Sequence, residues 1–235
     1  AIGESIVYSD KLNFGYLIPI NFFKVYDQVN SRYNIKAGDN SQFFGFISSR
    51  NHIKNTHLYA QVFIDEIRAS KIFDKRERRN QLGYTIGASK TDLFAHYFTV
   101  GAEYSRVNPF VYNNLIPAQT YTNHSYVLGD WMGNNADRFY LFAQYVPLPK
   151  LRMKLWHQSI RKGAGGTLYQ QYYQVPQPPF LFEKLFDYKE TAFSIRYEWI
   201  NRLVASLEFN SITTTNVNAS PVKQNALRFG ISYGL

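Results

Sequence analysis

Apolar and polar residues alternate along most of this chain, and no other feature of the sequence restricts the possible folds as strongly. Near the C-terminus, Leu227, Phe229 and Ile231 alternate with Arg228 and Gly230. Successive side chains of a β-strand point to opposite faces, so a period of two predicts strands with one apolar and one polar face. The same period recurs in residues 81–89, 95–107, 188–199 and 202–214. The chain is therefore predicted to be all-β.

Ten strands are expected, near residues 1–9, 41–49, 57–68, 81–89, 95–107, 138–147, 150–162, 188–199, 202–214 and 225–235. Every second connection is short, whereas long loops are predicted near 10–40, 69–80, 108–137, 163–187 and 215–224. Short turns at one end and long loops at the other are typical of antiparallel transmembrane β-barrels. A soluble sandwich has no physical reason to sort its loops in this way. We expect residues 1–235 to form a single outer-membrane barrel domain, or the C-terminal half of a larger one, with the long loops extracellular.

The composition agrees with a barrel. Aromatic residues make up 17% of the chain, with 19 Tyr and 19 Phe, which suits the aromatic girdles of a barrel at the two membrane interfaces. No run of about 18 apolar residues is present, which excludes a transmembrane helix. The absence of cysteine excludes disulfides and thiolate metal sites, and no cofactor is indicated. Because the chain starts at Ala1 without a signal peptide, we expect a mature, processed or truncated form.

The net charge of +9 indicates anionic partners. Nucleic acid is one such class. The lysines and arginines, however, lie mostly at predicted strand ends, in one loop and singly on polar strand faces, and they form no basic helix or known nucleic-acid-binding motif. We therefore favour outer-membrane lipid, lipopolysaccharide and surface polysaccharide as partners, and we expect no binding of nucleic acid.

Several stretches resemble the capsule assembly Wzi-like family, and more specifically the branch that includes gliding-motility accessory proteins. They are residues 2–8 (IGESIVY), 16–23 (YLIPINFF), 38–40 (GDN), 58–66 (LYAQVFIDE) and 103–112 (EYSRVNPFVY). The resemblance implies a barrel of about 18 strands with helical plug elements. It also implies an outer-membrane lectin that anchors capsular polysaccharide. This chain is too short for that many strands, so the resemblance assigns it to the C-terminal portion of the barrel.

Two of the long loops are rich in aromatic residues, and these are the candidate ligand-binding positions. A sugar presents a flat C–H surface that an aromatic ring can cover, and hydroxyls that planar polar groups can bind; Tyr interleaved with Gln supplies both. Packing of the loops over the barrel mouth, or contact with a partner protein, is the alternative and is favoured for any individual residue. The candidates are Tyr112, Tyr121, Tyr126 and Trp131 in the loop 108–137, and Tyr169, Tyr172 and Tyr173 in the loop 163–187.

The loop 69–80 is strongly basic. Arg76, Arg78 and Arg79 follow Lys71 and Lys75. On the extracellular side these arginines could bind phosphates or uronates, because a guanidinium matches such anions with two parallel hydrogen bonds. A solvated loop that merely tolerates charge is an equally weighted alternative.

Charged residues are also predicted on lumen-facing positions of the strands. Two interpretations are open: they bind a polyanion inside the barrel, or they pair with one another across the lumen, which we favour. These residues are Asp65, Glu103, Arg152, Lys154, Arg196, Glu198, Glu208 and Arg228.

An enzymatic role is weighed against two non-enzymatic ones. His157 and Ser159 share a strand face, which is similar to outer membrane phospholipase A, where a serine nucleophile needs an adjacent base. Here, however, Ile160 and Arg161 replace the Asn-Gly that should follow. The leading hypothesis is a non-catalytic barrel that binds surface polysaccharide, and the second is a barrel subunit that binds partner proteins of a gliding or secretion assembly.

Overall fold

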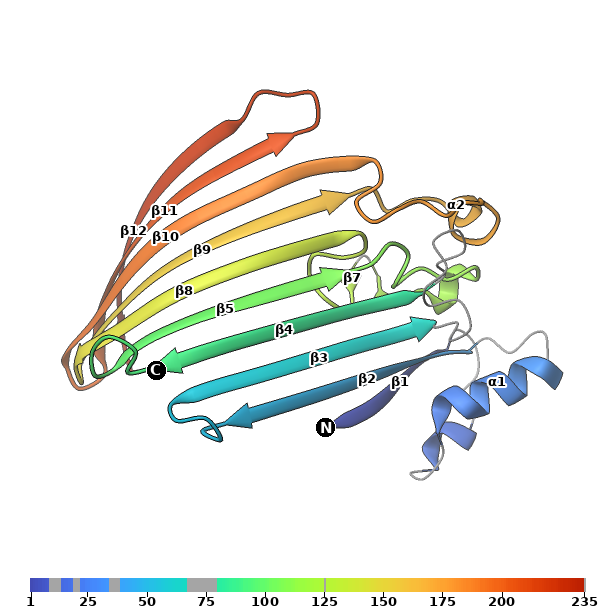
Figure 1. Cartoon of the computed structure of the whole chain (residues 1–235), viewed down its shortest axis with the longest axis horizontal. Coiled ribbons are helices and arrows are strands. Elements are labelled where there is room, and N and C mark those ends of the chain that lie inside the picture. The colour runs from blue at the N-terminus through green and yellow to red at the C-terminus, as the bar shows by residue number, and fades with distance from the viewer. Residues whose placement is uncertain (9–13, 19–21, 34–38, 67–79, 125, 235) are drawn as a thin grey trace.

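The computed structural model describes residues 1–8, 14–18, 22–33, 39–66, 80–124 and 126–234. Ten antiparallel strands form one sheet in which nearly every strand pairs with its neighbours in the chain (Figure 1). In sheet order they are β1 (Ile2–Tyr8), β2 (Asp39–Arg50), β3 (Thr56–Glu66), β4 (Gln81–Thr91), β5 (Phe98–Val107), β8 (Ala136–Leu148), β9 (Leu151–Gly163), β10 (Lys184–Ile200), β11 (Leu203–Asn216) and β12 (Val222–Tyr233). A two-residue hairpin, β6 (Thr122–Asn123) with β7 (Tyr126–Val127), is separate.

All ten predicted strands are present, and the differences are at their ends. β10 begins at Lys184, four residues before the predicted start. β11 continues to Asn216 and β12 begins at Val222, so the connection expected near 215–224 is a turn of only five residues, 217–221. Thr213, Thr214 and Thr215 explain the extension of β11, because β-branched side chains favour strands even where they are polar.

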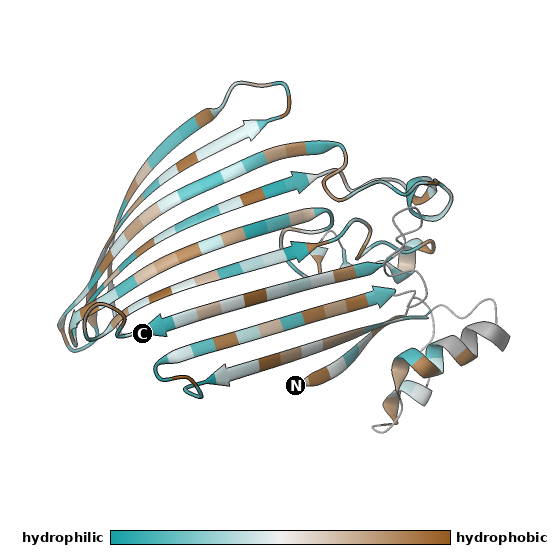
Figure 2. Cartoon of the chain, viewed as in Figure 1, coloured by the Kyte–Doolittle hydropathy of each residue, from teal (hydrophilic) through white to brown (hydrophobic). Residues whose placement is uncertain are grey.

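The pairing register sorts the side chains into two kinds of row. One row is apolar across six consecutive strands, β5 to β12: Val100, Ala143, Leu155, Phe193, Phe209 and Leu227. The adjacent row points to the opposite face and is polar: Thr99, Gln144, Lys154, Ser194, Glu208 and Arg228. Figure 2 shows the resulting alternation of brown and teal along the strands. We call the face of the apolar row the outer face and the opposite one the inner face.

The two ends of the sheet differ. One end carries only the short connections 51–55, 92–97, 149–150 and 201–202 (Figure 1). At the other end lie helix α1 (Phe23–Tyr33), the short helices η1 (Phe14–Leu17), η3 (Pro117–Gln119) and α2 (Leu168–Tyr172), and the β6–β7 hairpin. Among the described connections, the turn 217–221 is short although it lies at the loop end, where a longer loop near 215–224 is expected from the sequence.

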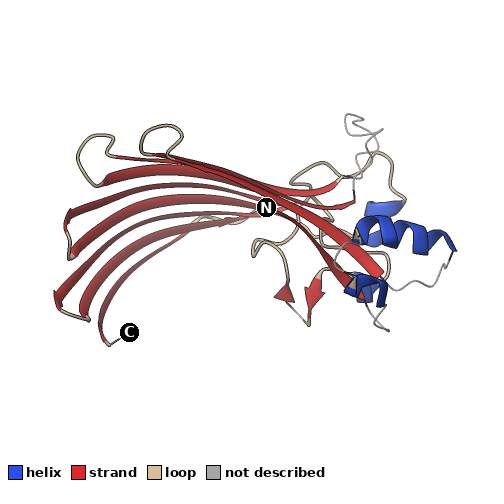
Figure 3. Cartoon of the chain, turned by 90° about the horizontal axis from the view of Figure 1, so that it is seen from below, coloured by secondary structure: helices blue, strands red, loops and turns tan. Residues whose placement is uncertain are grey.

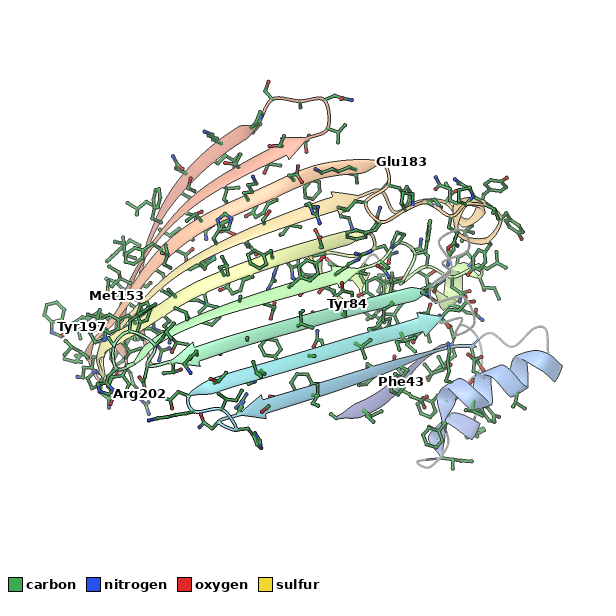
Figure 4. The ribbon with its side chains drawn as sticks, in the orientation of Figure 1. Phe43, Tyr84, Met153, Glu183, Tyr197 and Arg202 are labelled. Carbon is green, nitrogen blue, oxygen red and sulfur yellow. The ribbon has the colours of Figure 1, made fainter. Side chains whose placement is uncertain are left out.

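Exposed aromatic side chains gather on the outer face near the short-turn end. Phe98 packs against Tyr145 with 6.0 Å between ring centroids. Tyr197, Trp199 and Tyr233 are exposed on the neighbouring strands, and Figure 4 labels Tyr197 at this end. Amphipathic aromatic rings are enriched where a protein surface passes from an apolar to an aqueous environment.

The segment 108–135 packs on the inner face and contributes buried residues to both hydrophobic clusters of the described chain. Figure 3 shows its β6–β7 hairpin on the side toward which the sheet curves. Val107, Val111 and Tyr112 form one buried cluster, against which Phe63 and Tyr121 pack. A second cluster joins Met132, Ala136 and Ile160, with Tyr188 beside it. The interior is therefore filled at the loop end.

The ten strands do not close on themselves. In the part of the chain that the structure describes, β1 and β12 lie at opposite edges of the sheet and are not paired with each other. An unpaired edge exposes a row of backbone N–H and C=O groups. No helix of the described residues is both long enough and apolar enough to cross a membrane.

Candidate functional site

Helix α2 presents two stacked tyrosines at the loop end. Tyr169 and Tyr173 are four residues apart, a spacing that places both rings on one side of a helix. Their centroids are 6.1 Å apart with 28° between the planes, and about two thirds of each side chain is exposed. The helix starts with a capping box, in which Thr167 accepts from the Gln170 backbone and the Gln170 side chain accepts from the Thr167 backbone. A preformed helix thus holds a flat aromatic surface open to solvent.

Tyr172 of the same helix makes a different contact. Its hydroxyl accepts a hydrogen bond from the Leu115 backbone N–H at 3.2 Å, which ties α2 to the segment 108–135. Burial raises the pKa of the Tyr172 hydroxyl above its ordinary value. Next to it, the buried Gln171 side chain donates to the Asn113 carbonyl at 3.2 Å. Tyr172 and Gln171 therefore anchor the helix that presents Tyr169 and Tyr173.

The candidates of the other loop separate into two kinds. Tyr126, at the β6–β7 hairpin, and Trp131 are exposed. Tyr112 is only 4% exposed, stacks on Tyr121 at 6.0 Å and accepts a hydrogen bond from the Asp130 backbone at 2.8 Å. Burial raises the pKa of Tyr112 to about 12. Tyr112 therefore holds the segment 108–135 in place and has no free face for a ligand, and the half-buried Tyr121 packs beside it.

Three predicted residues cannot be placed. Arg76, Arg78 and Arg79 lie outside the described residues, and so do Lys71 and Lys75. Their anion-binding role stays a prediction.

Two residues of the predicted lumen set, Glu208 and Arg228, pair with each other on the inner face. Glu103 pairs with Arg138, a residue outside that set. Arg138 reaches Glu103 at 2.6 Å, and Arg228 reaches Glu208 at 3.2 Å. The Tyr59 hydroxyl also donates to Glu103, although the two residues lie on β3 and β5. The Tyr59 ring crosses the intervening strand over Gly87, where a Cβ atom would lie 2.2 Å from Cζ of the ring.

Three aromatic residues on the inner face were not singled out from the sequence. Tyr140 and Phe142 of β8 stack at 5.8 Å, and Trp156 is on β9. The ammonium group of Lys154 lies 5.7, 5.4 and 5.7 Å from the centroids of Tyr140, Phe142 and Trp156. Residues 139–143 are apolar or aromatic at every position, so the period of two gives no signal for the face that Tyr140 and Phe142 occupy.

The proposed similarity of His157 and Ser159 to a hydrolase site has little geometric support. The Nδ1 atom of His157 lies 2.8 Å from the Thr191 hydroxyl. Thr191 is the direct cross-strand partner of His157 in the β9–β10 register. A catalytic serine needs a base within hydrogen-bonding reach, and the hydroxyl that the structure places beside this imidazole is that of Thr191.

Helix α1 is fastened to the loop end of the first strands. The Lys24 ammonium donates to the carbonyl of Ser41 at 2.8 Å and to that of Asp65. Asp27 accepts from the Ser41 hydroxyl at 2.9 Å. The carboxylate of Glu4 accepts from the Phe23 backbone at the start of the helix, at 2.7 Å, which caps unpaired N–H groups. A helical element therefore lies at the loop end of the sheet.

These features define a mostly-β protein, built as a ten-stranded antiparallel sheet with an apolar outer face, a polar and aromatic inner face, and its helices at one end. The sequence model of the family described as capsule assembly protein Wzi matches residues 18–227. The chain belongs to this family. The expected resemblance is confirmed at the level of the family.

One solved structure is similar. The outer membrane channel DcaP of Acinetobacter baumannii shares 12% sequence identity, with a TM-score of 0.48, over 82% of this chain and 51% of that chain. The present chain thus spans about half the length of that protein. No curated protein matches the sequence.

Proposed function

We propose that the chain is an integral outer-membrane protein that binds and retains capsular polysaccharide without catalysis. Membership of the capsule assembly family supports capsular polysaccharide as the ligand. The apolar rows of the outer face, with exposed aromatic residues at one end, support a location in the membrane. The short turns would face the periplasm and the loop end would face outward. In this arrangement the exposed tyrosines meet the capsule.

The unpaired edges of the sheet, at β1 and β12, are the basis for the complete architecture that we propose. Backbone groups left unpaired in lipid are strongly unfavourable, so a membrane sheet must close. We propose that further strands pair with β1 and β12 and complete a barrel of about 18 strands. The described sheet would then form rather more than half of the wall.

The observation that carries the binding role is the exposed pair of Tyr169 and Tyr173. A stacked pair of rings loses little conformational freedom when a sugar covers it, because α2 already fixes its geometry. Tyr126 and Trp131 add aromatic surface at the same end. Each sugar contact only exchanges water for protein, so a single site is expected to be weak. Retention then comes from many repeats of one polymer through effective concentration.

The test replaces Tyr169 and Tyr173 together with alanine in the full-length protein. We expect encapsulated cells to shed more polysaccharide. Val175→Ala is the matched control, because Val175 is exposed in the same loop but is not aromatic. Unchanged shedding in the double variant, with normal amounts of folded protein, would remove the tyrosine pair from the site.

A second function remains open to test. A barrel subunit of a gliding or secretion assembly would cover the same aromatic loops with partner protein. In that case the double variant would impair gliding or secretion and leave the capsule in place.

A further inference from the structure

Three cations of the inner face lie together without a carboxylate partner. Arg152 of β9 is the direct cross-strand partner of Arg196 of β10, and Lys154 is the next inner-face residue along β9. None of the three forms an ion pair with a carboxylate in the described part of the chain. Met153, labelled in Figure 4, lies between Arg152 and Lys154 and marks the place near the short-turn end. We call Arg152, Lys154 and Arg196 the basic cluster.

Like charges directly opposite each other on neighbouring strands destabilise a sheet. The pairing of Arg152 with Arg196 is therefore unfavourable unless an anion or solvent compensates it. Elsewhere on this face, Glu103 compensates Arg138 and Glu208 compensates Arg228. The basic cluster is thus a local excess of positive charge, in contrast to Arg138 and Arg228 on the same face, which pair with carboxylates.

Aromatic rings border the basic cluster. The Lys154 ammonium lies within 5.4–5.7 Å of three ring centroids, those of Tyr140, Phe142 and Trp156. Such contacts attract a cation to the ring face and hold the flexible lysine side chain over the wall. All three rings are only partly buried, so part of their surface is open on the inner side. Flat apolar rings and fixed cations lie next to each other here.

The aromatic surface continues toward the loop end. The guanidinium of Arg138 lies 5.2 Å from the Tyr140 ring and 6.0 Å from the ring of Trp131. Trp131, Ile160 and Tyr188 line a cavity of about 400 Å³ there. Aromatic rings therefore line the inner face from the exposed Trp131 at the loop end to the basic cluster.

We propose that this inner-face track binds an acidic stretch of polysaccharide, with pyranose faces on Tyr140, Phe142 and Trp156 and sugar carboxylates on Lys154, Arg152 and Arg196. The proposal rests on the proposed function and deepens it, because it names a carboxylated sugar as the ligand and places a second binding region inside the wall. A neutral sugar would use the rings and leave the cations uncompensated, so it binds more weakly.

The experiment is calorimetric titration of the full-length protein in detergent with an oligogalacturonate and, separately, with a malto-oligosaccharide of equal length. We expect the acidic oligomer to bind more tightly and its binding to weaken with salt. Lys154→Gln, and Arg152→Gln with Arg196→Gln, should each lower its affinity by about tenfold, the scale of a lost hydrogen bond to a charged group. Binding of the neutral oligomer should stay unchanged in both.

Arg228→Gln is the matched control, because Arg228 is an inner-face cation that already has a carboxylate partner. It should change the affinity less than about twofold. Equal effects of Arg228→Gln and Lys154→Gln, or equal affinities of the wild-type protein for both oligomers, would overturn the proposal. Tyr169→Ala with Tyr173→Ala separates the two proposals. If that variant sheds capsule while Lys154→Gln leaves the titration unchanged, the inner-face track is refuted and the proposed function stands.

Discussion

Phe229 of β12 lies directly opposite Leu207 of β11, and both side chains are exposed on the outer face. The next residue, Gly230, pairs with Ser206 on the inner face. If the outer face meets lipid, Phe229→Asp puts a charge into the membrane. The free energy of unfolding should then fall by at most about 2–4 kcal/mol, which is the range for a basic residue at mid-membrane depth, because acidic residues are less unfavourable there.

Gly230→Asp is the matched substitution one residue away. A Cβ atom at Gly230 would lie 2.9 Å from the Ser206 hydroxyl oxygen, which can rotate aside. The inner face is polar, so the added carboxylate is expected to have a small effect. Folding yield into lipid vesicles measures both variants, and equal losses would contradict the assignment of the two faces.

The topology can be read from epitope tags on intact cells. A tag in the turn 217–221 or in the connection 164–183 should bind antibody from outside, because both lie at the loop end. A tag at residues 201–202 should be reached only after the outer membrane is permeabilised. The reverse labelling pattern would place the aromatic loops in the periplasm and exclude their contact with the capsule.

Gly87 is required for the contact between Tyr59 and Glu103. A methyl group at this position would overlap the Tyr59 ring, so Gly87→Ala should displace the ring and lower stability by about 1–3 kcal/mol, the usual range for overpacking. Gly165→Ala is the control, since a Cβ atom there has no neighbour within 4 Å. Thermal unfolding in detergent compares Gly87→Ala with Gly165→Ala. Equal unfolding midpoints would show that the Tyr59 ring does not cross β4 at Gly87.

The strands could be predicted because their residues carry a local signal. Ala205, Leu207 and Phe209 alternate with Ser206, Glu208 and Asn210, and the structure places the three apolar side chains on the outer face. The extension of β11 to Thr215 and Asn216 is not predicted from the sequence, because polar residues in a strand resemble a loop when only hydrophobicity is considered.

The candidate site was harder to predict, because burial depends on contacts between distant segments. Tyr112 and Tyr169 are both loop tyrosines in the sequence, yet one lies in the core beneath Gly129 and the other is open to solvent. The pairing of Arg152 with Arg196 follows from the register of β9 and β10, which no single segment encodes.

The buried tyrosine leads to a prediction on pH. The ordinary pKa of a tyrosine hydroxyl is 10.0, and burial raises that of Tyr112 to about 12 in the folded protein. The unfolded chain therefore releases this proton at a lower pH than the folded protein does. The contribution of the protonated Tyr112 hydroxyl to the free energy of unfolding is fully present below about pH 10 and is lost as the pH rises toward 12.

Tyr112→Phe should remove this dependence. The variant also loses the hydrogen bond from the Asp130 backbone, which should lower stability near neutral pH by about 1 kcal/mol. The difference between the unfolding midpoints of the wild type and Tyr112→Phe should therefore become smaller as the pH rises from 8 to 11, toward the pKa of Tyr112. Parallel curves would show that Tyr112 ionises as an exposed tyrosine does. Tyr126→Phe, at an exposed position, is the control and should follow the wild type.

The central claim is that this protein holds capsular polysaccharide at the cell surface. The most direct test is the ratio of cell-bound to shed polysaccharide in an encapsulated strain that lacks the gene, with and without the gene restored. Our account predicts that the deletion releases polysaccharide into the medium and that the wild-type gene restores retention. A deletion strain that keeps its capsule but loses gliding or protein secretion would contradict the account and favour a subunit that binds partner proteins.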